Sequence, residues 1–398
     1  MITSHDVIII GGGSAGYAAA RTAQAEGASV GIVDQGPLGG LCILRGCMPT
    51  KTILRSSDLA ALIRRAPEFG IHSSNLRVSL SAILERKNRL IKEFADDRIQ
   101  ALQHPKFTLY QEHAQFVSPT VIQAGPHRLA AKAYIIATGS VVSHILIPGL
   151  EEAGYLTSDE ALELKTMPES MIVLGGGPVA LELAQFFVRI GVEVTLIQRS
   201  AQILSDSDVG LVRPVEAHLR AEGMKVYTGT QIQQITTSGE QKTIHFRYQG
   251  QTQQATAVSI LQALGRRPNI DRLNLAAAQV AHQREVIPVN KEMRTSQPHI
   301  FAVGDVNGGY EIVHIAIEEG EIAGWNAVHP DLPPKHFDDR LKTQVVFTDP
   351  QVASVGLSER ECLLDRQIPY LVASYPFNDH GKSLCLGETY GHVKVLCH

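Results

Sequence analysis

The 398-residue sequence predicts an α/β protein with two Rossmann-like dinucleotide-binding units. Two observations support this prediction. A buried-strand pattern, a glycine-rich turn, a helix and a second strand follow one another at Gly11 and again at Gly175. A pair of cysteines, Cys42 and Cys47, stands between the two units. A reactive dithiol beside a dinucleotide-binding unit suggests redox chemistry.

The first unit begins with the apolar run from Val7 to Ile10, which predicts a buried parallel strand. A G-x-G-x-x-G turn follows, and then a predicted helix from Tyr17 to Glu26. These glycines allow a tight turn and a close backbone approach to a pyrophosphate, and the helix N-terminus supplies N–H groups. A strand from Ser29 to Val33 ends in an acid that can accept ribose hydroxyls. The expected dinucleotide site contains Gly11, Gly13, Ser14, Ala15, Gly16 and Asp34.

Cys42 and Cys47 lie in a glycine-rich stretch, and a proline follows Met48. Because proline fits the first turn of a helix, we expect a helix to begin near Met48. Residues five apart in a regular helix lie about 8.6 Å apart, so a disulfide between the cysteines requires a looped or distorted chain, which Gly46 permits. A helix N-terminus at Cys47, with Lys51 one turn later, would lower the pKa of this thiol. The alternatives are a metal half-site or two buried thiols. No Cys/His pair at ligand spacing appears elsewhere, and we expect no metal.

The second unit follows a predicted linker at Pro148-Gly149. A strand is expected from Met171 to Leu174, a helix up to Ile190 and a strand from Val192 to Ile197. The segment from Lys225 to Leu261 is rich in strand formers and completes this unit. The turn before the helix repeats the dinucleotide pattern and contributes Gly175, Gly177, Val179 and Ala180.

Two further predicted strands, one from Tyr134 and one from Ile300, end in residues that suit a cofactor. The first strand ends in a turn of small residues, which lets the backbone approach a ligand, although an ordinary strand end is the alternative. The second strand ends in an acid, which can accept a hydrogen bond from a sugar-like hydroxyl. Helices are expected from Ser79 to Leu102 and from His314 to Val328, and the tail from Gln344 to His398 predicts a short third domain of strands. The strand ends contribute Thr138, Gly139, Ser140, Gly304 and Asp305.

Composition excludes several classes of protein. The net charge of −4 gives no basic field for nucleic acid or an anionic membrane, and no apolar run is long enough to span a bilayer. The N-terminus lacks the basic region of a signal peptide. Five cysteines, only two of them close together, do not form a secreted disulfide framework, so we expect a cytoplasmic protein.

These motifs, in this order, closely resemble the flavin-dependent pyridine nucleotide–disulfide oxidoreductases, which include dihydrolipoamide dehydrogenase, glutathione reductase and mercuric reductase. The resemblance covers nearly the whole chain, and its most specific part is the Cys-x4-Cys-Met-Pro-Thr-Lys core from Cys42 to Lys51. It implies an FAD-binding domain over residues 1–148 and 271–334, with an NAD(P)-binding domain over 149–270 inserted in it. Residues 335–398 correspond to part of an α+β dimerisation domain, so a homodimer is expected.

The resemblance also implies residue roles. Cys42 resembles the interchange thiol that attacks a small-molecule or protein-bound disulfide, and Cys47 the charge-transfer thiol against the flavin. Lys51 resembles the lysine near flavin N5, paired with Glu182, and Asp305 the aspartate that bonds the ribityl chain. Hydride would pass from nicotinamide to flavin, and two electrons would then reduce the disulfide. The residues expected to bind FAD and NADPH or NADH are Gly11, Gly13, Ser14, Ala15, Gly16, Asp34, Gly40, Cys42, Lys51, Thr138, Gly139, Ser140, Gly175, Gly177, Val179, Ala180, Glu182, Arg199, Gly265, Asp305, His314 and Ala316.

Two features depart from the family pattern. NADH-using members carry an acid where Gln198 stands, and Arg199 can pair with the 2′-phosphate of NADPH, so we predict NADPH as the coenzyme. The helix start at His314 gives the opposite indication, because it resembles that of dihydrolipoamide dehydrogenases, which use NAD. Family members also continue beyond position 398 through an acid–base His-Pro motif, and we expect weak disulfide turnover without it. His380 and His398 are possible substitutes, but we interpret both as surface histidines.

Dihydrolipoamide dehydrogenase-like activity is our main hypothesis. The alternatives are a mercuric or other metal-ion reductase, a catalytically weak flavin-binding redox sensor, and an NAD(P)H oxidase. Cys362, Cys385 and Cys397 stand alone, and we interpret them as structural or incidental thiols.

Overall fold

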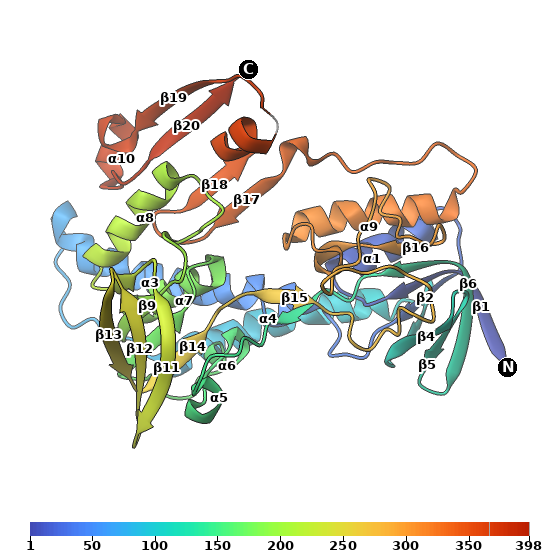
Figure 1. Ribbon diagram of the computed structural model, residues 1–398, viewed down its shortest axis with the longest axis horizontal. Coiled ribbons are helices and arrows are strands. Elements are labelled where there is room, and N and C mark those ends of the chain that lie inside the picture. Colours follow the sequence, from blue (N-terminus) through green and yellow to red (C-terminus); the bar gives the residue numbers. More distant parts are fainter. Residues whose placement is uncertain (366, 398) are drawn as a thin grey trace. The chain divides into compact units, whose positions relative to one another are not determined.

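Figure 1 shows the computed structural model of the chain, which describes residues 1–365 and 367–397. The chain divides into two compact units. The first contains residues 1–48, 88–143 and 266–339, and the second contains residues 49–87, 144–265 and 340–398. The α/β fold, with a largely parallel sheet in the first unit and a parallel sheet in the second, is the one that the sequence predicts, whereas the domain boundaries at residues 148, 270 and 334 stay a prediction.

The first unit is built on a seven-stranded sheet in the order β3-β2-β1-β6-β5-β4, with β16 also paired to β6. Strands β1, β2, β3, β6 and β16 run parallel to one another. Strand β5 pairs antiparallel with β6, and β4 pairs antiparallel with β5. The carboxyl-terminal halves of the central strands β1 and β6 are buried, because their aliphatic runs face protein on both sides. The strands of this sheet are β1 (Ile2–Ile10), β2 (Val30–Val33), β3 (Phe107–Tyr110), β4 (Ala114–Ser118), β5 (Val121–Ala124), β6 (His127–Ile136) and β16 (Ile300–Ala302).

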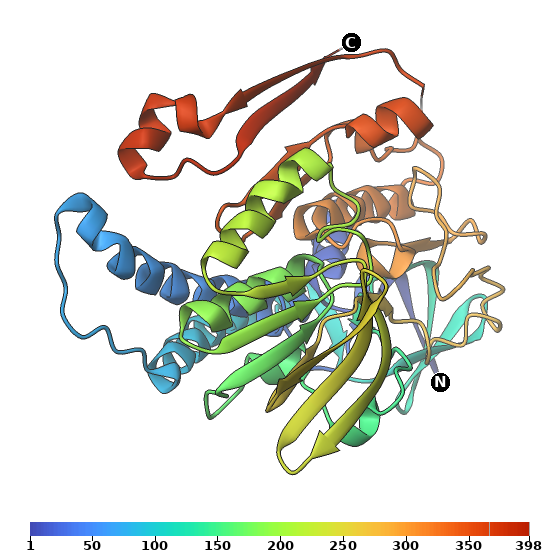
Figure 2. The ribbon, with the colours of Figure 1, turned by 60° about the vertical axis from the view of Figure 1, so that its left-hand side comes forward.

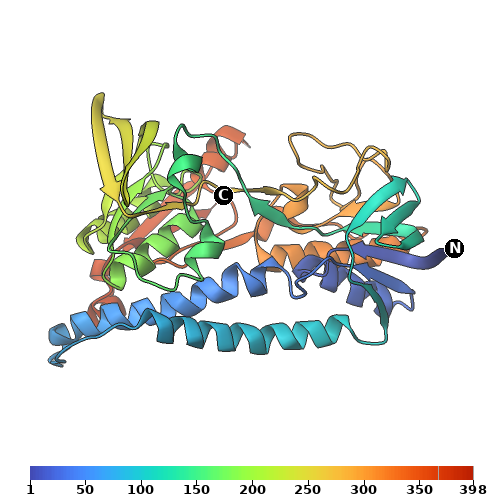
Figure 3. The same cartoon turned by 90° about the horizontal axis from the view of Figure 1, so that it is seen from below.

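Helices α1 (Ser14–Ala25) and α9 (Val313–Val328) pack closely in this unit. A Cβ atom at Gly320 would lie 2.3 Å from the carbonyl oxygen of Ala15, so only glycine allows the two backbones to approach this closely. The unbroken helix α4 (Leu80–Leu102), seen in cyan in Figure 3, ends with Leu102 inside the core of this unit. The unit also contains α2 (Leu41–Leu44), β7 (Ser140–Val142), β15 (Arg266–Pro268) and η2 (Gly304–Asn307).

The second unit has a four-stranded parallel sheet in the order β10-β9-β8-β14. A three-stranded antiparallel sheet, β11-β12-β13, also belongs to this unit (Figure 2). Its Ile244 and Phe246 belong to an apolar cluster with Ile172 of β8. The strands are β8 (Ser170–Leu174), β9 (Glu193–Ile197), β10 (Lys225–Tyr227), β11 (Gln231–Ser238), β12 (Gln241–Tyr248), β13 (Gln251–Ala257) and β14 (Ser259–Gln262).

Helices of the second unit form a separate apolar cluster with the parallel sheet, which includes Ile53, Phe187 and Leu219. The main helices are α7 (Pro178–Arg189), α8 (Val209–Ala221) and α3 (Cys47–Arg65), whose first two residues belong to the first unit. The remaining elements are η1 (Ala66–Phe69), α5 (Leu150–Ala153), α6 (Ser158–Ala161), η3 (Asp339–Leu341), β17 (Thr343–Val346), β18 (Val352–Val355), η4 (Glu361–Asp365), β19 (Leu371–Pro376), η5 (Phe377–Asp379), α10 (Gly381–Leu386) and β20 (His392–Cys397).

Candidate functional site

The glycine turn after β1 forms a narrow backbone cradle in the first unit. Gly11 has φ +104°, and a Cβ atom there would lie 2.4 Å from the carbonyl oxygen of Ala137. A Cβ atom at Gly16 would lie 1.8 Å from the oxygen of Gly11. Helix α1 starts at Ser14, and its N-cap Gly13 has no side chain to cap the first N–H groups. These donors and the missing side chains fit the pyrophosphate of a dinucleotide.

Asp34 is held beside this cradle by backbone hydrogen bonds. Its Oδ2 accepts from the N–H of Gly12 at 2.6 Å, and its Oδ1 accepts from the N–H of Gly36 at 2.7 Å. A carboxylate has about four lone-pair positions, so Asp34 can still accept from ribose hydroxyls.

A second group of predicted residues lies at the carboxyl ends of β6 and β16. The hydroxyl of Ser140 donates to Asp305 Oδ2 at 2.6 Å, and Arg266 Nε donates to Ser140 Oγ at 2.9 Å. Gly304, which precedes Asp305, packs between Ala15 and Ala316. A Cβ atom placed on Gly304 would lie 3.4 Å from the Cβ atom of each alanine. The glycine turn, Asp305 and the first turns of α1 and α9 therefore converge.

Sequence reasoning missed three polar residues of this region. Arg266 orients Ser140, and the backbone oxygen of Asn269 accepts from the Thr138 hydroxyl at 2.8 Å. A signal was present, because both residues closely follow Gly265, which was expected to bind a cofactor. Glu319 is nearly fully buried and accepts from the N–H of Gly304 at 2.6 Å. Burial raises the pKa of Glu319 to about 7.

The two cysteines lie on consecutive helices. Cys42 belongs to α2, whose N-cap Gly40 approaches Gly13: a Cβ atom at Gly40 would lie 2.7 Å from the Gly13 Cα. The first turns of α1 and α2 are therefore in contact. Cys47 is the first residue of α3, as expected from the proline after Met48.

Arg45 and Gly46 interrupt the helix between the two cysteines, which agrees with the looped or distorted chain that a disulfide would require, but the expected role of Gly46 needs a correction. Helix α2 ends at Leu44, and Arg45 has φ −141°. Gly46 was predicted to supply backbone freedom, yet it is not among the residues with positive φ. A Cβ atom there would lie 3.2 Å from the oxygen of Leu41 and 3.3 Å from the Cα of Cys42, so close packing favours glycine.

Lys51 and Glu182 form an ion pair in the second unit. Lys51 Nζ lies 2.7 Å from Glu182 Oε2, and the Glu182 side chain is only 3% exposed. The second carboxylate oxygen accepts from the N–H of Phe347 at 3.0 Å. The Lys51 ammonium also lies 4.9 Å from the centre of the Phe347 ring. Phe347 therefore contacts both members of the predicted pair, and Lys51 lies one turn after Cys47 in the same helix.

A buried ionic cluster continues along the same face of α7. Arg189 is 3% exposed and bonds Asp58 of α3 at 2.7 Å and Asp349 at 2.6 Å, and it also pairs with Glu222. Burial opposes ionisation of Glu222, but hydrogen bonds from His218 and Arg189 outweigh it and lower the pKa to about 2. Lys51 and Asp58 are seven residues apart, as are Glu182 and Arg189. Two ion pairs two turns apart therefore join α3 to α7.

Side-chain atoms of His218, Glu222 and Asp349 lie within 4.8 Å of one another, a spacing that a metal ion could use. The guanidinium of Arg189 already bonds both carboxylates. A metal would have to displace this buried cation, so we assign none to the cluster.

The second glycine turn lies in the second unit. Gly175 has φ +115°, and a Cβ atom there would lie 2.4 Å from the oxygen of Ala263. Gly177 caps α7 without a side chain, so Val179 and Ala180 belong to the first turn. The side chain of Gln198 packs at 3.0 Å from the Cβ position of Gly176, and the next residue, Arg199, is exposed.

The family model described as pyridine nucleotide-disulphide oxidoreductase matches residues 5–320. The chain belongs to this family. The model of the family's dimerisation domain matches residues 343–398. Members of the family use FAD and NAD(P)H, and the cradle and Asp34 fit the dinucleotide part of such a group.

Relatives include two kinds of enzyme. The chain is 35% identical to a mercuric reductase of Staphylococcus aureus over 98% of this chain and 72% of the relative. It is 31% identical to a dihydrolipoyl dehydrogenase of Bacillus subtilis over 100% of this chain and 86% of the relative. A solved structure with the same fold, the Cu(II) complex of the HOCl-induced flavoprotein disulfide reductase RclA from Escherichia coli, has a TM-score of 0.85 at 24% identity and covers 99% of this chain and 86% of that one.

The other histidines and cysteines that the sequence analysis named, together with His329, lie in different settings. His314 lies in the first turn of α9, and His329 stacks on Trp325 with 4.5 Å between ring centres. His380 is exposed and lies 3.1 Å from the Ser383 hydroxyl, and His398 lies outside the described residues. Cys362 is buried, whereas Cys385 and Cys397 are exposed.

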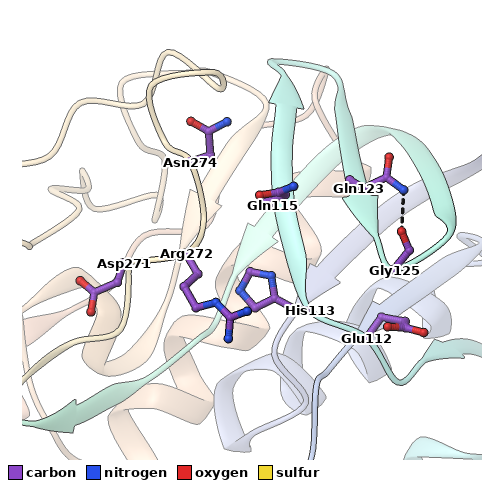
Figure 4. Close-up of a pocket in the computed structure, with 8 residues that line it drawn as sticks. All are labelled: Glu112, His113, Gln115, Gln123, Gly125, Asp271, Arg272 and Asn274. Atoms are coloured by element: carbon purple, nitrogen blue, oxygen red, sulfur yellow. Dashed lines mark hydrogen bonds between the residues drawn. The ribbon is translucent and has the colours of Figure 1, made fainter.

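The first unit also contains a pocket of about 540 Å³ (Figure 4). Burial and the charge of Arg272 lower the pKa of His113, which points toward that guanidinium. No residue of the predicted cofactor site lines this pocket, and we give it no role. Its lining is Glu112, His113, Gln115, Gln123, Gly125, Asp271, Arg272 and Asn274. No helix among residues 1–365 and 367–397 meets the length and hydropathy needed to cross a bilayer.

Proposed function

We propose that this chain transfers electrons between NAD(P)H and a disulfide or dithiol substrate through Cys42 and Cys47, with FAD as the intermediate carrier. The observation that carries this proposal is the position of the cysteines. Cys42 lies on a helix whose first turn contacts the FAD-type glycine turn, and Cys47 begins α3. Bound FAD would accept a hydride and deliver two electrons to the disulfide.

The protein residues then have separable tasks. The N-terminus of α3 would favour a thiolate at Cys47. The Cys42 thiolate would attack one sulfur of the substrate disulfide, form a mixed disulfide and release the other sulfur as a thiolate. Cys47 would then attack Cys42, release the second substrate thiolate and restore the Cys42–Cys47 bond. The Lys51–Glu182 pair would hold a cation one turn from Cys47, and Ser140 would orient Asp305 toward the ribityl chain.

The coenzyme we propose is NADPH. Gln198 carries no charge that would repel a 2′-phosphate, and the exposed Arg199 can pair with it bidentately. We expect kcat/KM to favour NADPH, and Arg199→Ala to lose about tenfold on NADPH while changing NADH little. A preference of the unmodified protein for NADH would refute this assignment.

The substrate we propose is a lipoamide-type dithiol or disulfide, as for the dihydrolipoyl dehydrogenase relatives. A metal-ion reductase is the second candidate, because a mercuric reductase is 35% identical to this chain. Steady-state assays with lipoamide and with Hg(II) separate the two. We expect faster NADPH oxidation with lipoamide, abolished in Cys42→Ser. Turnover only with Hg(II) would support the second candidate, and turnover with neither would favour the redox sensor.

We also propose that the protein forms a homodimer through its C-terminal segment. The dimerisation-domain match covers this segment. Strands β19 and β20 carry exposed apolar side chains, among them Leu371 at 74%, Val372 at 53% and Val395 at 55%. Sedimentation equilibrium is expected to give twice the chain mass, and Val372→Lys to lower the association constant.

A further inference from the structure

Glu319 of α9 is a buried carboxylate that has no cation beside it. The residue is 3% exposed. Its oxygen Oε2 accepts two hydrogen bonds, from the N–H of Gly304 at 2.6 Å and from Asn307 Nδ2 at 2.9 Å. Among residues 1–365 and 367–397, no lysine, arginine or histidine pairs with this carboxylate. Burying a carboxylate without a cation is costly, so the presence of an acid here requires an explanation.

Both donors belong to the turn that follows β16. The N–H of Val303 still bonds a carbonyl oxygen of β6, at 2.9 Å. The next N–H, that of Gly304, donates to Glu319 of α9 and not to a neighbouring strand. Asn307 holds the other end of the turn, because its Oδ1 accepts from the N–H of Gly309 at 2.8 Å while its Nδ2 donates to Glu319. One carboxylate oxygen therefore anchors both ends of η2.

Asp305 lies between these two anchored residues. Gly304, which precedes it, has φ +71°, and the N–H of Gly308 bonds the backbone oxygen of Asp305 at 3.1 Å. The Asp305 carboxylate also accepts from the hydroxyl of Ser140 at 2.6 Å. Because the backbone on both sides of Asp305 is held by Glu319, the direction of the Asp305 side chain depends on that buried acid.

The same face of α9 contacts the helix that begins at the first glycine turn. Ala316 of α9 and Ala15 of α1 each lie 3.4 Å from the Cβ position of Gly304. A Cβ atom at Gly320, the residue after Glu319, would lie 2.3 Å from the oxygen of Ala15. Residues three and four apart share a helix face. One turn of α9 therefore holds together the turn after β16 and the start of α1, the two parts expected to meet the ribityl chain and the pyrophosphate of FAD.

We propose that Glu319 is a positioning residue for FAD, which anchors the turn from Gly304 to Asn307 so that Asp305 meets the ribityl chain in a fixed direction. This inference rests on the proposed function, in which Asp305 bonds the ribityl chain. Glu319 forms no bond to the cofactor and transfers no proton; it accepts two hydrogen bonds. A site that is held in its binding geometry loses less freedom when the ligand binds.

The test measures how firmly the protein holds FAD. Each FAD-loaded protein is diluted, and the FAD released with time is measured in the ultrafiltrate. Glu319→Leu removes the acceptor, whereas Glu319→Gln keeps an acceptor oxygen. The matched control is Glu318→Leu, at the exposed neighbour on the same helix. Each of the three changes is made alone and together with Asp305→Ala.

We expect Glu319→Leu to release FAD about tenfold faster, because Gly304 and Asn307 lose their shared acceptor. Glu319→Gln and Glu318→Leu should stay within about twofold of the unmodified protein. Asp305→Ala should release FAD about thirtyfold faster, since it removes a charged acceptor for the ribityl chain. With Asp305→Ala present, Glu319→Leu should add no further effect, because its influence passes through Asp305.

Two results would overturn the proposal. The first is an unmodified rate of FAD release in Glu319→Leu. The second is a full tenfold effect of Glu319→Leu in the Asp305→Ala protein, because Glu319 would then support the fold in general and not Asp305. If far-UV circular dichroism shows that Glu319→Leu does not fold, Asn307→Ala makes the same test by removing one of the two donors. FAD release about threefold faster is then expected, and an unchanged rate would overturn the proposal.

Failure of the proposed function gives a different pattern. If the release rates change as expected but the unmodified protein turns over no disulfide, the inference about Glu319 stands and the assigned activity is wrong. If Asp305→Ala leaves the release rate unchanged, the proposed contact of Asp305 with the ribityl chain is wrong, and the inference about Glu319 fails with it. If Asp305→Ala speeds release and Glu319→Leu does not, only the inference about Glu319 fails.

Discussion

Glu319 provides a direct test of the polar interior around the FAD-type site. One of its oxygens, Oε2, accepts both from the N–H of Gly304 at 2.6 Å and from Asn307 Nδ2 at 2.9 Å. Burial raises its pKa from an ordinary 4.5 to about 7. In Glu319→Gln, the amide oxygen can take both hydrogen bonds while the ionisation is removed.

The pH dependence follows from the raised pKa. Below pH 4.5 the Glu319 carboxyl is protonated in the folded and unfolded states alike, so it adds no penalty. Between pH 4.5 and 7 the unfolded state releases its proton first, and stability is progressively lost; above pH 7 the penalty is constant. By linkage the penalty is about 1 kcal/mol at pH 5 and about 3 kcal/mol at pH 8.

The assay is urea unfolding followed by tryptophan fluorescence at pH 5 and pH 8. The chain has one tryptophan, Trp325, and it lies on α9 with Glu319, so the signal reports this unit. We expect Glu319→Gln to stabilise the protein by about 2 kcal/mol more at pH 8 than at pH 5. The control Glu318→Gln changes an exposed neighbour on α9. Equal effects of Glu319→Gln at both pH values, or a net destabilisation at pH 8, would refute the reasoning.

Two further predictions concern the face of α7. Arg189→Met leaves Asp58, Glu222 and Asp349 without their buried cation and should cost about 3–5 kcal/mol in urea unfolding, whereas Arg220→Met, at an exposed pair with Glu216, should cost at most about 0.5 kcal/mol. Similar costs for both arginines would contradict the account of the cluster. Glu182→Gln keeps an acceptor for the N–H of Phe347 but removes the charge partner of Lys51. We expect the reduction of the bound flavin, measured by stopped flow, to slow about tenfold in this variant. An unchanged rate would show that the Lys51–Glu182 pair has no part in this step.

Local patterns allowed much of this site to be predicted from sequence. The glycine turns, the acid at Asp34 and the helix start at Cys47 each depend on residues adjacent in the chain, so their chemistry is readable there. The pairing of Lys51 with Glu182, 131 positions apart, came only from family resemblance.

Long-range contacts explain what could not be predicted. Arg189 pairs with Asp58, Glu222 and Asp349, and these four residues lie in four separate segments of the chain. No spacing in the sequence indicates that they come together. Arg98 lies on the helix predicted from Ser79 to Leu102, and nothing in its local sequence indicates that its guanidinium packs on the Tyr17 ring. Gly46 showed the limit of a local rule, since packing against Leu41 and Cys42, and not its own φ, decides its identity.

The central claim is that the Cys42–Cys47 pair exchanges electrons with the bound flavin. Anaerobic titration of the FAD-loaded protein with NADPH, followed from about 400 to 600 nm, tests it most directly. We predict a broad long-wavelength band after two-electron reduction, lost in Cys47→Ser, because a Cys47 thiolate would lie against the flavin. Simple bleaching of the flavin without this band would contradict the account, since the dithiol would then be uncoupled from the cofactor.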